Sequence, residues 1–372
     1  MLSDPLADRF ALYSANRLKL GLFGANCSSG RAVTTLPERW SGSWDDNLAL
    51  ARMAEAAGLE FLLPVGRWRG YGGRTDYQGE TLETVTWATG LLAATERITV
   101  FGTVHAPLIH PLVAAKQFVT ADHIGRGRFG LNVVCGWNAD EFEMFGAELR
   151  AHDDRYTYAG EWLEAVTRAW GNEESFDLDG ASLRLRGVRA KPKPYGGTRP
   201  VVMNAAASPA GQAFALRWCD ALFSMTSLGT LDEFAAHIRA VTGQARALGR
   251  SIDVYTVAVV TCRPTRAEAE AAYRHAMIDH ADWDAVDAIL AMRGVTRASH
   301  PDFERHRQHQ VNGLGGLPII GDPDDVAAIL ARLGEMGTRG VAISFVNYLE
   351  ELPLFRDAVL PRLARMGWRA AA

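Results

Sequence analysis

The sequence predicts an α/β fold, a closed (β/α)8 TIM barrel, because eight apolar segments rich in β-branched residues alternate with helical segments along the chain. Each apolar segment is nearly continuous in hydrophobicity rather than alternating, which is typical of parallel strands covered on both faces. The expected strands span residues 19–26, 61–66, 98–106, 128–136, 201–206, 221–226, 253–262 and 340–347. A doubly wound sheet is the alternative, but the turn after the first strand reads GANCSSG and lacks the GxGxxG pattern of that fold.

Helical segments separate the expected strands. Residues 45–58 begin with an aspartate, carry apolar residues at spacings of three to four, and end at Gly58. Residues 110–125 end in the same way at Gly125. Further helices are expected at residues 81–95, 154–171, 209–218, 229–248, 265–281, 323–336 and 350–366. This regular order of strands and helices favours a closed barrel.

The chain is expected to form a single domain, residues 1–372, with two insertions into the repeat. Residues 172–200 contain two short β-like runs around an Asp-Gly pair, which predicts a hairpin excursion. Residues 282–320 precede the eighth strand and contain a glycine-rich run, 312–316, which is a candidate hinge. Long insertions into compact domains are usually functional lids or disordered segments, and we expect this one to act as a lid over the active site.

Composition excludes several classes of protein. Charged residues make up 22% of the chain, the net charge is −4, and the arginines are scattered, so no nucleic-acid partner is expected. No apolar run is long enough to span a membrane, and the first residues lack a signal-peptide pattern, so we expect a cytoplasmic protein without membrane contact. The four cysteines are far apart and lack metal-ligand spacing, so we expect free thiols and no metal site.

The residues that end the expected strands indicate the kind of chemistry, because barrel active sites lie at the carboxyl ends of the strands. These positions lack a carboxylate pair, a GxSxG nucleophile and a lysine placed for a Schiff base. They supply aromatic rings, amides, hydroxyls, arginines and glycines instead. Such a set suits a planar aromatic cofactor that brings the reactive chemistry with it. The alternative is that these polar groups only satisfy loop backbone.

A phosphate site is predicted where a helix follows the fifth strand. Ser208 precedes Pro209 at the start of that helix, and the free amides of a helix N-terminus suit an anion. Arg155 and Tyr156 would add a charge and a hydroxyl to the same site. Both predictions have plainer alternatives: Ser208 as a simple helix cap, and Arg155 with Tyr156 as part of a solvated helix face.

Three segments, residues 68–111, 121–146 and 152–162, carry a resemblance to a known family. The second includes GRFGLNVVCGWNADEFEMFG, and the third reads HDDRYTYAGEW. Together they resemble the luciferase-like flavin monooxygenases, and within these the branch of pyrimidine monooxygenases and dimethylsulfone/alkanesulfonate monooxygenases. The similarity extends over residues 18–368, nearly the whole chain.

The resemblance implies a two-component enzyme that uses FMN, taken up as FMNH2, together with O2. A separate NAD(P)H:flavin reductase would supply the electrons. Residues at the positions of the family's cofactor contacts are Gly66, Arg67, Asn132, Glu141, Arg155, Tyr156 and Ser208. The small pocket that holds O2 in this branch corresponds to Leu63, Thr103 and Asn132.

Departures from the branch concern the substrate. His105 stands where the pyrimidine enzymes have alanine, and Cys135 stands where they have threonine or serine. His105 is therefore a candidate titrating group in catalysis, its alternative being a hydrogen-bonded barrel histidine. Further candidates to hold the substrate are Trp137, Tyr348 and Arg69. We expect a small N-heterocycle or amide as the substrate.

Two other activities fit the same scaffold. A sulfone or alkanesulfonate would need cationic contacts, for which Arg67, Arg69, Arg293 and Arg297 are available. An F420-dependent oxidoreductase would move hydride without O2, and the retained Leu63, Thr103 and Asn132 argue against it. A homodimer or homotetramer is expected through the apolar helix at residues 81–95, unless residues 1–17 cover that helix.

Overall fold

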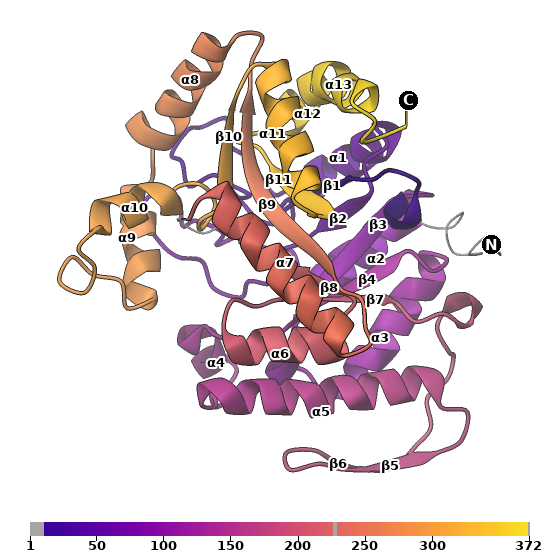
Figure 1. Ribbon diagram of the computed structural model, residues 1–372. Helices are drawn as coiled ribbons and strands as arrows, with labels where there is room; N and C mark the ends of the chain where they lie inside the picture. Colours follow the sequence, from indigo (N-terminus) through magenta and orange to yellow (C-terminus); the bar gives the residue numbers. More distant parts are fainter. Residues whose placement is uncertain (1–10, 226–228, 371–372) are drawn as a thin grey trace.

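The computed structural model describes residues 11–225 and 229–370, and it forms a closed barrel of eight parallel strands surrounded by helices (Figure 1). The strands follow one another around the barrel in chain order, and the last pairs with the first. They are β1 (Lys19–Phe23), β2 (Phe61–Leu63), β3 (Thr99–His105), β4 (Phe129–Val134), β7 (Val201–Ala205), β8 (Ala221–Phe223), β9 (Asp253–Cys262) and β11 (Gly340–Ser344). This arrangement confirms the predicted fold class.

The main helices also lie where the periodicity predicts them. They are α1 (Trp44–Ala56), α2 (Thr84–Ala94), α3 (Pro111–Ile124), α5 (His152–Gly171), α6 (Pro209–Trp218), α7 (Leu231–Ala247), α8 (Arg266–Arg274), α11 (Pro323–Glu335), α12 (Tyr348–Leu354) and α13 (Leu360–Arg365). The helix expected at residues 350–366 is interrupted by a π-helical segment, η5 (Phe355–Val359), and the helix expected at residues 265–281 ends in another, η4 (His275–Asp279). Short elements that the sequence did not indicate are η1 (Ala11–Tyr13), η2 (Ala106–Leu108), η3 (Tyr195–Gly197) and α4 (Ala139–Met144).

Aromatic rings fill the interior of the barrel. Phe61 lies edge-on to Phe101 and to Tyr255, with ring centroids 6.2 and 5.6 Å apart. Gly21 and Gly130 make room for these rings, because a Cβ at either position would come within 2.5 Å of the Phe61 or the Phe101 side chain. Because these aromatic rings fill the middle of the barrel, this part is a packed core, and the cavity described below lies at the strand ends.

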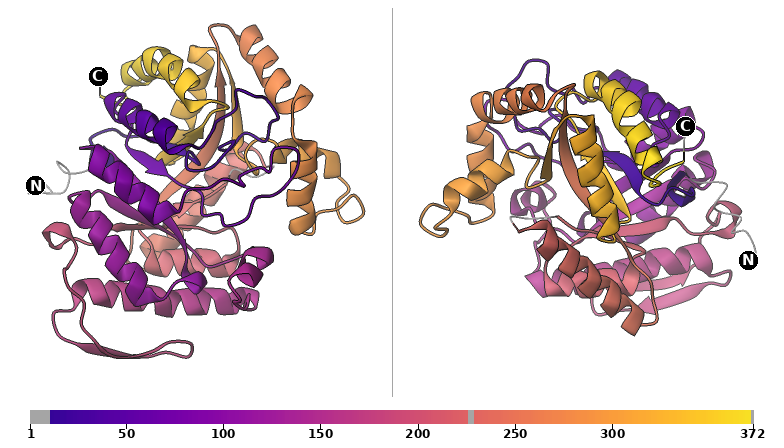
Figure 2. Two further views of the ribbon diagram at one scale, coloured as in Figure 1. Left: turned by 180° about the vertical axis from the view of Figure 1, so that it is seen from behind. Right: turned by 45° about the horizontal axis from the view of Figure 1, so that its top comes forward.

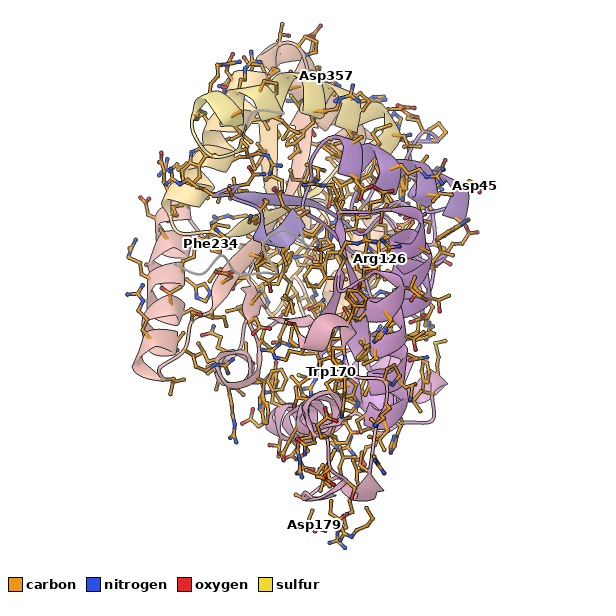
Figure 3. All side chains as sticks on the ribbon, turned by 90° about the vertical axis from the view of Figure 1, so that its right-hand side faces the viewer. Asp45, Arg126, Trp170, Asp179, Phe234 and Asp357 are labelled. Carbon is orange, nitrogen blue, oxygen red and sulfur yellow. The ribbon has the colours of Figure 1, made fainter. Side chains whose placement is uncertain are left out.

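A hairpin of β5 (Phe176–Asp179) and β6 (Arg184–Val188) leaves the barrel between α5 and β7. Its turn is held by Glu161 of α5, whose carboxylate accepts backbone N–H groups from residues 181–183 at 2.8–2.9 Å. Asp179 of this hairpin lies at one extreme of the molecule (Figure 3), and Figure 1 shows the hairpin beyond α5. The hairpin is therefore remote from the strand ends that carry the chemistry.

Residues 282–320 fold into α9 (Trp283–Met292), α10 (Phe303–Gln310) and β10 (Leu317–Gly321). The two helices lie beside the loops that follow β1 and β2, as the rear view in Figure 2 shows. They share an apolar cluster with Val33 and Tyr77 of those loops. β10 pairs in parallel with Ala258–Cys262 of β9, the part of β9 that extends beyond its pairing with β8. β10 is thus the ninth strand of the barrel sheet, and the sequence did not predict it.

The described residues contain no helix long and apolar enough to cross a membrane. Within the same ranges no group of three or more His, Cys, Asp and Glu side chains is placed to hold a metal ion. Cys27, Cys135, Cys219 and Cys262 are all free and buried.

Candidate active site

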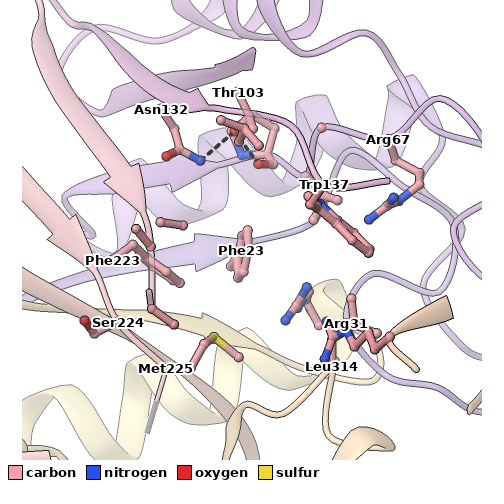
Figure 4. A pocket seen from close by; sticks show the side chains of 18 of the residues that line it. Phe23, Arg31, Arg67, Thr103, Asn132, Trp137, Phe223, Ser224, Met225 and Leu314 are labelled. Carbon is pink, nitrogen blue, oxygen red and sulfur yellow. Dashed lines mark hydrogen bonds between the residues drawn. The ribbon is translucent and has the colours of Figure 1, made fainter. Parts of the chain in front are cut away.

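A cavity of about 570 Å³ opens at the carboxyl ends of the barrel strands. Seven of the residues predicted from the sequence line it: Gly66, Arg67, Thr103, His105, Asn132, Trp137 and Arg293. Leu63 lies just below, buried among the interior side chains and one residue before the cavity-lining Pro64. Figure 4 shows Thr103 and Asn132 on one side of the pocket and Met225 on the opposite side. Phe23 lies between these two sides. Of the three predicted O2-pocket residues, Thr103 and Asn132 thus lie together on the cavity wall, whereas Leu63 lies in the barrel interior and does not line the cavity.

The orientation of the Asn132 amide is fixed by its neighbours. Thr103 on β3 and Asn132 on β4 are paired in register. The Thr103 hydroxyl donates to the Pro64 carbonyl at 2.7 Å, so it can only accept from Asn132, whose Nδ2 donates to it at 3.2 Å. The Oδ1 atom of Asn132 is consequently left buried without a protein partner among the described residues. Because Asn132 lines the cavity, this unpartnered acceptor lies in the cavity wall.

A buried ion pair borders the cavity. The Glu141 carboxylate, on the short helix α4, accepts from Arg67 Nη1 at 3.0 Å and from the backbone N–H of Trp68 at 2.9 Å. Arg67 also donates to the Tyr71 hydroxyl and lies over its ring. Glu141 is 1% exposed, so removing either partner of the pair would leave an uncompensated charge in the interior.

His105 lies beside this pair, with Nε2 3.9 Å from Glu141 Oε2. Burial lowers the pKa of His105, the Glu141 carboxylate opposes this shift, and the Arg67 charge adds to it. The imidazole is therefore neutral near pH 7. A neutral ring in the cavity wall can accept or donate a proton at a ring nitrogen during a reaction.

The predicted phosphate residues lie at the start of α6. Ser208 caps this helix by accepting the Gly211 N–H at 3.2 Å, and its hydroxyl donates to the Tyr156 hydroxyl at 3.3 Å. Residues 205–207 and Gln212, on either side of this cap, line the cavity. Arg155 donates to the Gly136 carbonyl at 2.8 Å, and its Nε atom is buried without a partner among the described residues. The capping role and a role toward an anion are thus compatible.

Two predicted substrate residues lie away from the cavity. Arg69 is exposed and pairs with Asp140 at 3.1 Å. Tyr348 is fully buried, its hydroxyl donates to the Phe23 carbonyl, and its ring packs edge-on against Trp40 at 5.0 Å. In this arrangement Tyr348 supports the cavity residue Phe23 from behind.

Several cavity residues were not predicted, among them Arg31 in the loop after β1. Arg293, one of the arginines named above for an anionic substrate, also lines the cavity from the end of α9. On the other side, Ser224 Oγ and His237 Nε2 are 3.0 Å apart. Arg31 follows a strand end, which was the only available signal for it. His237 reaches the cavity from α7, through packing that no local pattern indicates.

The comparisons with known proteins show to which enzyme class a chain with this fold and this site belongs. The model of the luciferase-like monooxygenase family matches residues 19–340, so the chain belongs to that family. The FMNH(2)-dependent dimethylsulfone monooxygenase of Pseudomonas fluorescens is 30% identical over 366 residues, covering 96% of this chain and 97% of the relative. The family and enzyme class predicted from the sequence are therefore confirmed.

Two further comparisons agree. The pyrimidine monooxygenase RutA of Agrobacterium fabrum is 29% identical over 353 residues, covering 92% of this chain and 96% of the relative. The crystal structure of DmoA from Hyphomicrobium sulfonivorans superimposes with a TM-score of 0.84 at 19% identity, covering 95% of this chain and 89% of that one. The second comparison supports the fold alone.

Proposed function

We propose that the protein is a two-component monooxygenase that takes reduced FMN and O2 and oxidises or cleaves a small N-heterocycle or amide. The observation that carries the proposal is the buried, unpartnered carbonyl oxygen of Asn132 in the cavity wall. A ring N–H of a flavin would satisfy it. The printed name of the Pseudomonas relative, which states dependence on FMNH(2), supports the same cofactor.

The residues present fit FMN at both of its ends. The cavity volume of about 570 Å³ falls within the range of roughly 300–1,000 Å³ that is typical of small-molecule and cofactor sites. Phe23 and Trp137 provide aromatic surface for the ring system. The N-terminus of α6 with Ser208 and Tyr156, and the unpartnered Nε atom of Arg155, would hold the phosphate.

Bound FMN would supply the redox chemistry and the activation of O2. The chain's own residues would position and protect the reactants. Asn132, oriented by Thr103, would fix the ring and, with Leu63, border the place of O2. The neutral His105 would give or take a proton at a ring nitrogen, and Arg67 would be held in place by Glu141. Residues 282–320 would cover the cavity and exclude water.

Partners and location are part of the same proposal. A separate NAD(P)H:flavin reductase would supply the electrons, and the enzyme would act in the cytoplasm. We also propose a homodimer or homotetramer, although four apolar residues of α2, the helix expected at the interface, are buried within one copy. These are Val85, Trp87, Leu91 and Leu92. Any interface between copies would therefore need other exposed side chains.

The substrate could instead be a sulfone or alkanesulfonate, a candidate supported by the printed name of the Pseudomonas relative. A panel of pyrimidines, amides, sulfones and sulfonates would be incubated with FMN, a flavin reductase and NADH under 18O2. Incorporation of label into one product, read by mass spectrometry, is the expected result. Absence of label from every product, together with hydride transfer from reduced F420, would overturn the proposal.

The role of Asn132 can be tested apart from turnover. We expect Asn132→Ala to weaken FMN binding about fivefold or more, because one hydrogen bond in a buried site is worth about 1 kcal/mol. Thr103→Ser is the matched control, since it retains the hydroxyl that orients the amide. Unchanged FMN affinity in Asn132→Ala, measured by flavin fluorescence titration, would contradict the assignment.

A further inference from the structure

Three arginines from three separate segments line the cavity. Arg31 comes from the loop after β1, Arg67 from the loop after β2, and Arg293 from the end of α9. Figure 4 shows Arg31 and Arg67, with Trp137, on the side of the pocket away from Phe223. The cavity therefore has a strongly cationic side.

Only part of this positive charge is compensated by the protein. Arg67 is paired with Glu141 at 3.0 Å. Within residues 11–225 and 229–370, neither Arg31 nor Arg293 has a carboxylate within ion-pair distance: Arg31 donates to the Gly313 carbonyl, and Arg293 donates to the Gln310 amide oxygen at 3.0 Å. Neutral acceptors satisfy N–H groups but leave the charges in place.

Both arginines also have unused capacity toward a ligand. Arg31 is 4% exposed, it lies over the Phe23 ring at 4.5 Å, and its Nε atom is buried without a partner among the described residues. Arg293 is exposed to solvent and lines the cavity. Its pKa is lowered, because desolvation by the surrounding protein and the charges of Arg31 and Arg67 outweigh the opposing effect of the Tyr71 hydroxyl. Repulsion between these guanidinium groups would be relieved by an anion placed among them.

Other charged groups of the cavity do not neutralise this side. The carboxylate of Glu233 is committed to capping α7, where it accepts the Thr230 N–H at 2.6 Å. His105 and His237 both have pKa values lowered by burial, so they are neutral near pH 7.

We propose that Arg31 and Arg293 form a subsite for an anionic group, a carboxylate or a sulfonate, on the substrate of the monooxygenase. The inference rests on the proposed function. It narrows the class of substrates to small molecules that carry a carboxylate or sulfonate group. A guanidinium group offers paired N–H donors that match the oxygens of such anions. Trp137, whose ring centroid is 5.9 Å from the Arg293 guanidinium carbon, would cover the apolar body of the acid.

The subsite can be tested with pairs of ligands that have nearly the same shape and differ in charge. Benzoate and benzamide form one pair, and benzenesulfonate and benzenesulfonamide form the other. Their dissociation constants would be measured by tryptophan fluorescence on the flavin-free protein and by flavin difference spectra on the FMN-loaded protein. We expect the anions to bind about tenfold or more tightly than their neutral partners, as hydrogen bonds to charged groups predict.

Arg31→Gln and Arg293→Gln should each remove most of this preference for anions. Arg307→Gln is the matched control: it breaks an ion pair with Asp287 inside residues 282–320 without removing a cavity cation, and it should retain the preference. Equal binding of anionic and neutral ligands by the wild-type protein would overturn the proposal. So would an equal loss of preference in Arg307→Gln.

A second arm separates the substrate from the flavin as the source of the anion. The affinities for FMN and for riboflavin, which lacks the phosphate, should stay within about twofold of wild type in Arg31→Gln and Arg293→Gln, because no hydrogen bond to the flavin is lost. A parallel fall in FMN affinity with riboflavin affinity unchanged would assign the arginines to the phosphate and overturn the inference. Failure to bind any flavin would reject the proposed function, while the titrations on flavin-free protein would still decide the anion subsite.

Discussion

At the scale of single residues, the cavity wall depends on how Arg67, Glu141 and His105 share one buried site. The carboxylate of Glu141 gives Oε1 to Arg67 and to the Trp68 backbone, and its Oε2 faces His105 from 3.9 Å, beyond hydrogen-bond distance. Glu141 Oε2 and Arg67 Nε are therefore both buried without a hydrogen-bond partner among the described residues. An imidazolium at this place would be desolvated and would face Arg67 as well as Glu141, so the neutral ring is the more stable form.

His105 should therefore make the stability of the protein depend on pH. Its pKa is lowered from 6.5 in the folded state, so between that folded pKa and 6.5 the unfolded chain binds more protons than the folded one. The stabilisation is present above pH 6.5 and is lost as the pH falls through the folded pKa. We expect the free energy of unfolding, measured in urea from about pH 8 to pH 5, to fall less steeply in His105→Asn than in wild type. His237 and His309 also have lowered pKa values and contribute to the slope that remains, and an unchanged slope in His105→Asn would contradict the prediction.

At the scale of elements, α6 shows how one local pattern serves both folding and the site. Ser208 and Pro209 begin the helix as the sequence predicts, and the same cap touches Tyr156. Gly211 permits this contact, because a Cβ there would come within 2.6 Å of the Tyr156 hydroxyl. Because the start of α6 lies this close to α5, its free backbone N–H groups and the hydroxyls of Ser208 and Tyr156 lie at one place, where an anion could bind.

Ser208→Asp separates the capping role from the phosphate role. Aspartate is a good N-cap, so the free energy of unfolding of the flavin-free protein should stay close to that of wild type, whereas Ser208→Ala should lose about 1 kcal/mol. A carboxylate at this position would repel the phosphate, and FMN affinity should fall by about tenfold or more while riboflavin affinity is unchanged. Chemical denaturation and flavin fluorescence titration provide the two measurements. Equal FMN affinity in Ser208→Asp and wild type would place the phosphate elsewhere.

The elements that could be predicted from sequence are those whose signal is local. Apolar runs and helix caps depend on residues close in sequence. The bounds predicted for the barrel strands and the main helices therefore lie within a few residues of the observed ones. β10 is only five residues long, and it forms because β9 extends beyond β8 and offers an open edge, which no pattern within residues 317–321 records. Asn132 and Thr103 were found because barrel topology brings strand ends together. Arg293 was named for its charge and its place in the insertion, but its position in the cavity wall depends on how α9 packs against distant loops, which no local pattern indicates.

At the scale of the whole molecule, the barrel provides the floor of the cavity and segments outside the repeat provide its rim. Residues 282–320 contribute Arg293 and Leu314 to the cavity, and the loops after β1 and β2 contribute Arg31 and Tyr71. These two sets of segments are joined by Asp282. Its buried carboxylate accepts backbone N–H groups from Arg74 at 3.1 Å and from Thr75 at 2.8 Å, and the Thr75 hydroxyl at 2.8 Å. Asp282 therefore ties the start of the insertion to the loop after β2.

Asp282→Ala should loosen the rim while leaving the barrel intact. The substitution removes the acceptor of two loop N–H groups and of the α9 cap at Ala285, and hydrogen bonds to a charged group contribute about 1.5–3 kcal/mol each. We expect faster amide hydrogen exchange in residues 72–77 and 283–292, with the exchange of β3 and β4 unchanged, because local opening needs less free energy than global unfolding. Asp284→Ala, on the exposed face of the same helix turn, is the control and should exchange like wild type. Uniform acceleration across the barrel strands would instead show that Asp282 supports the whole fold, and unchanged exchange at both segments would show that the rim is held by its apolar cluster alone.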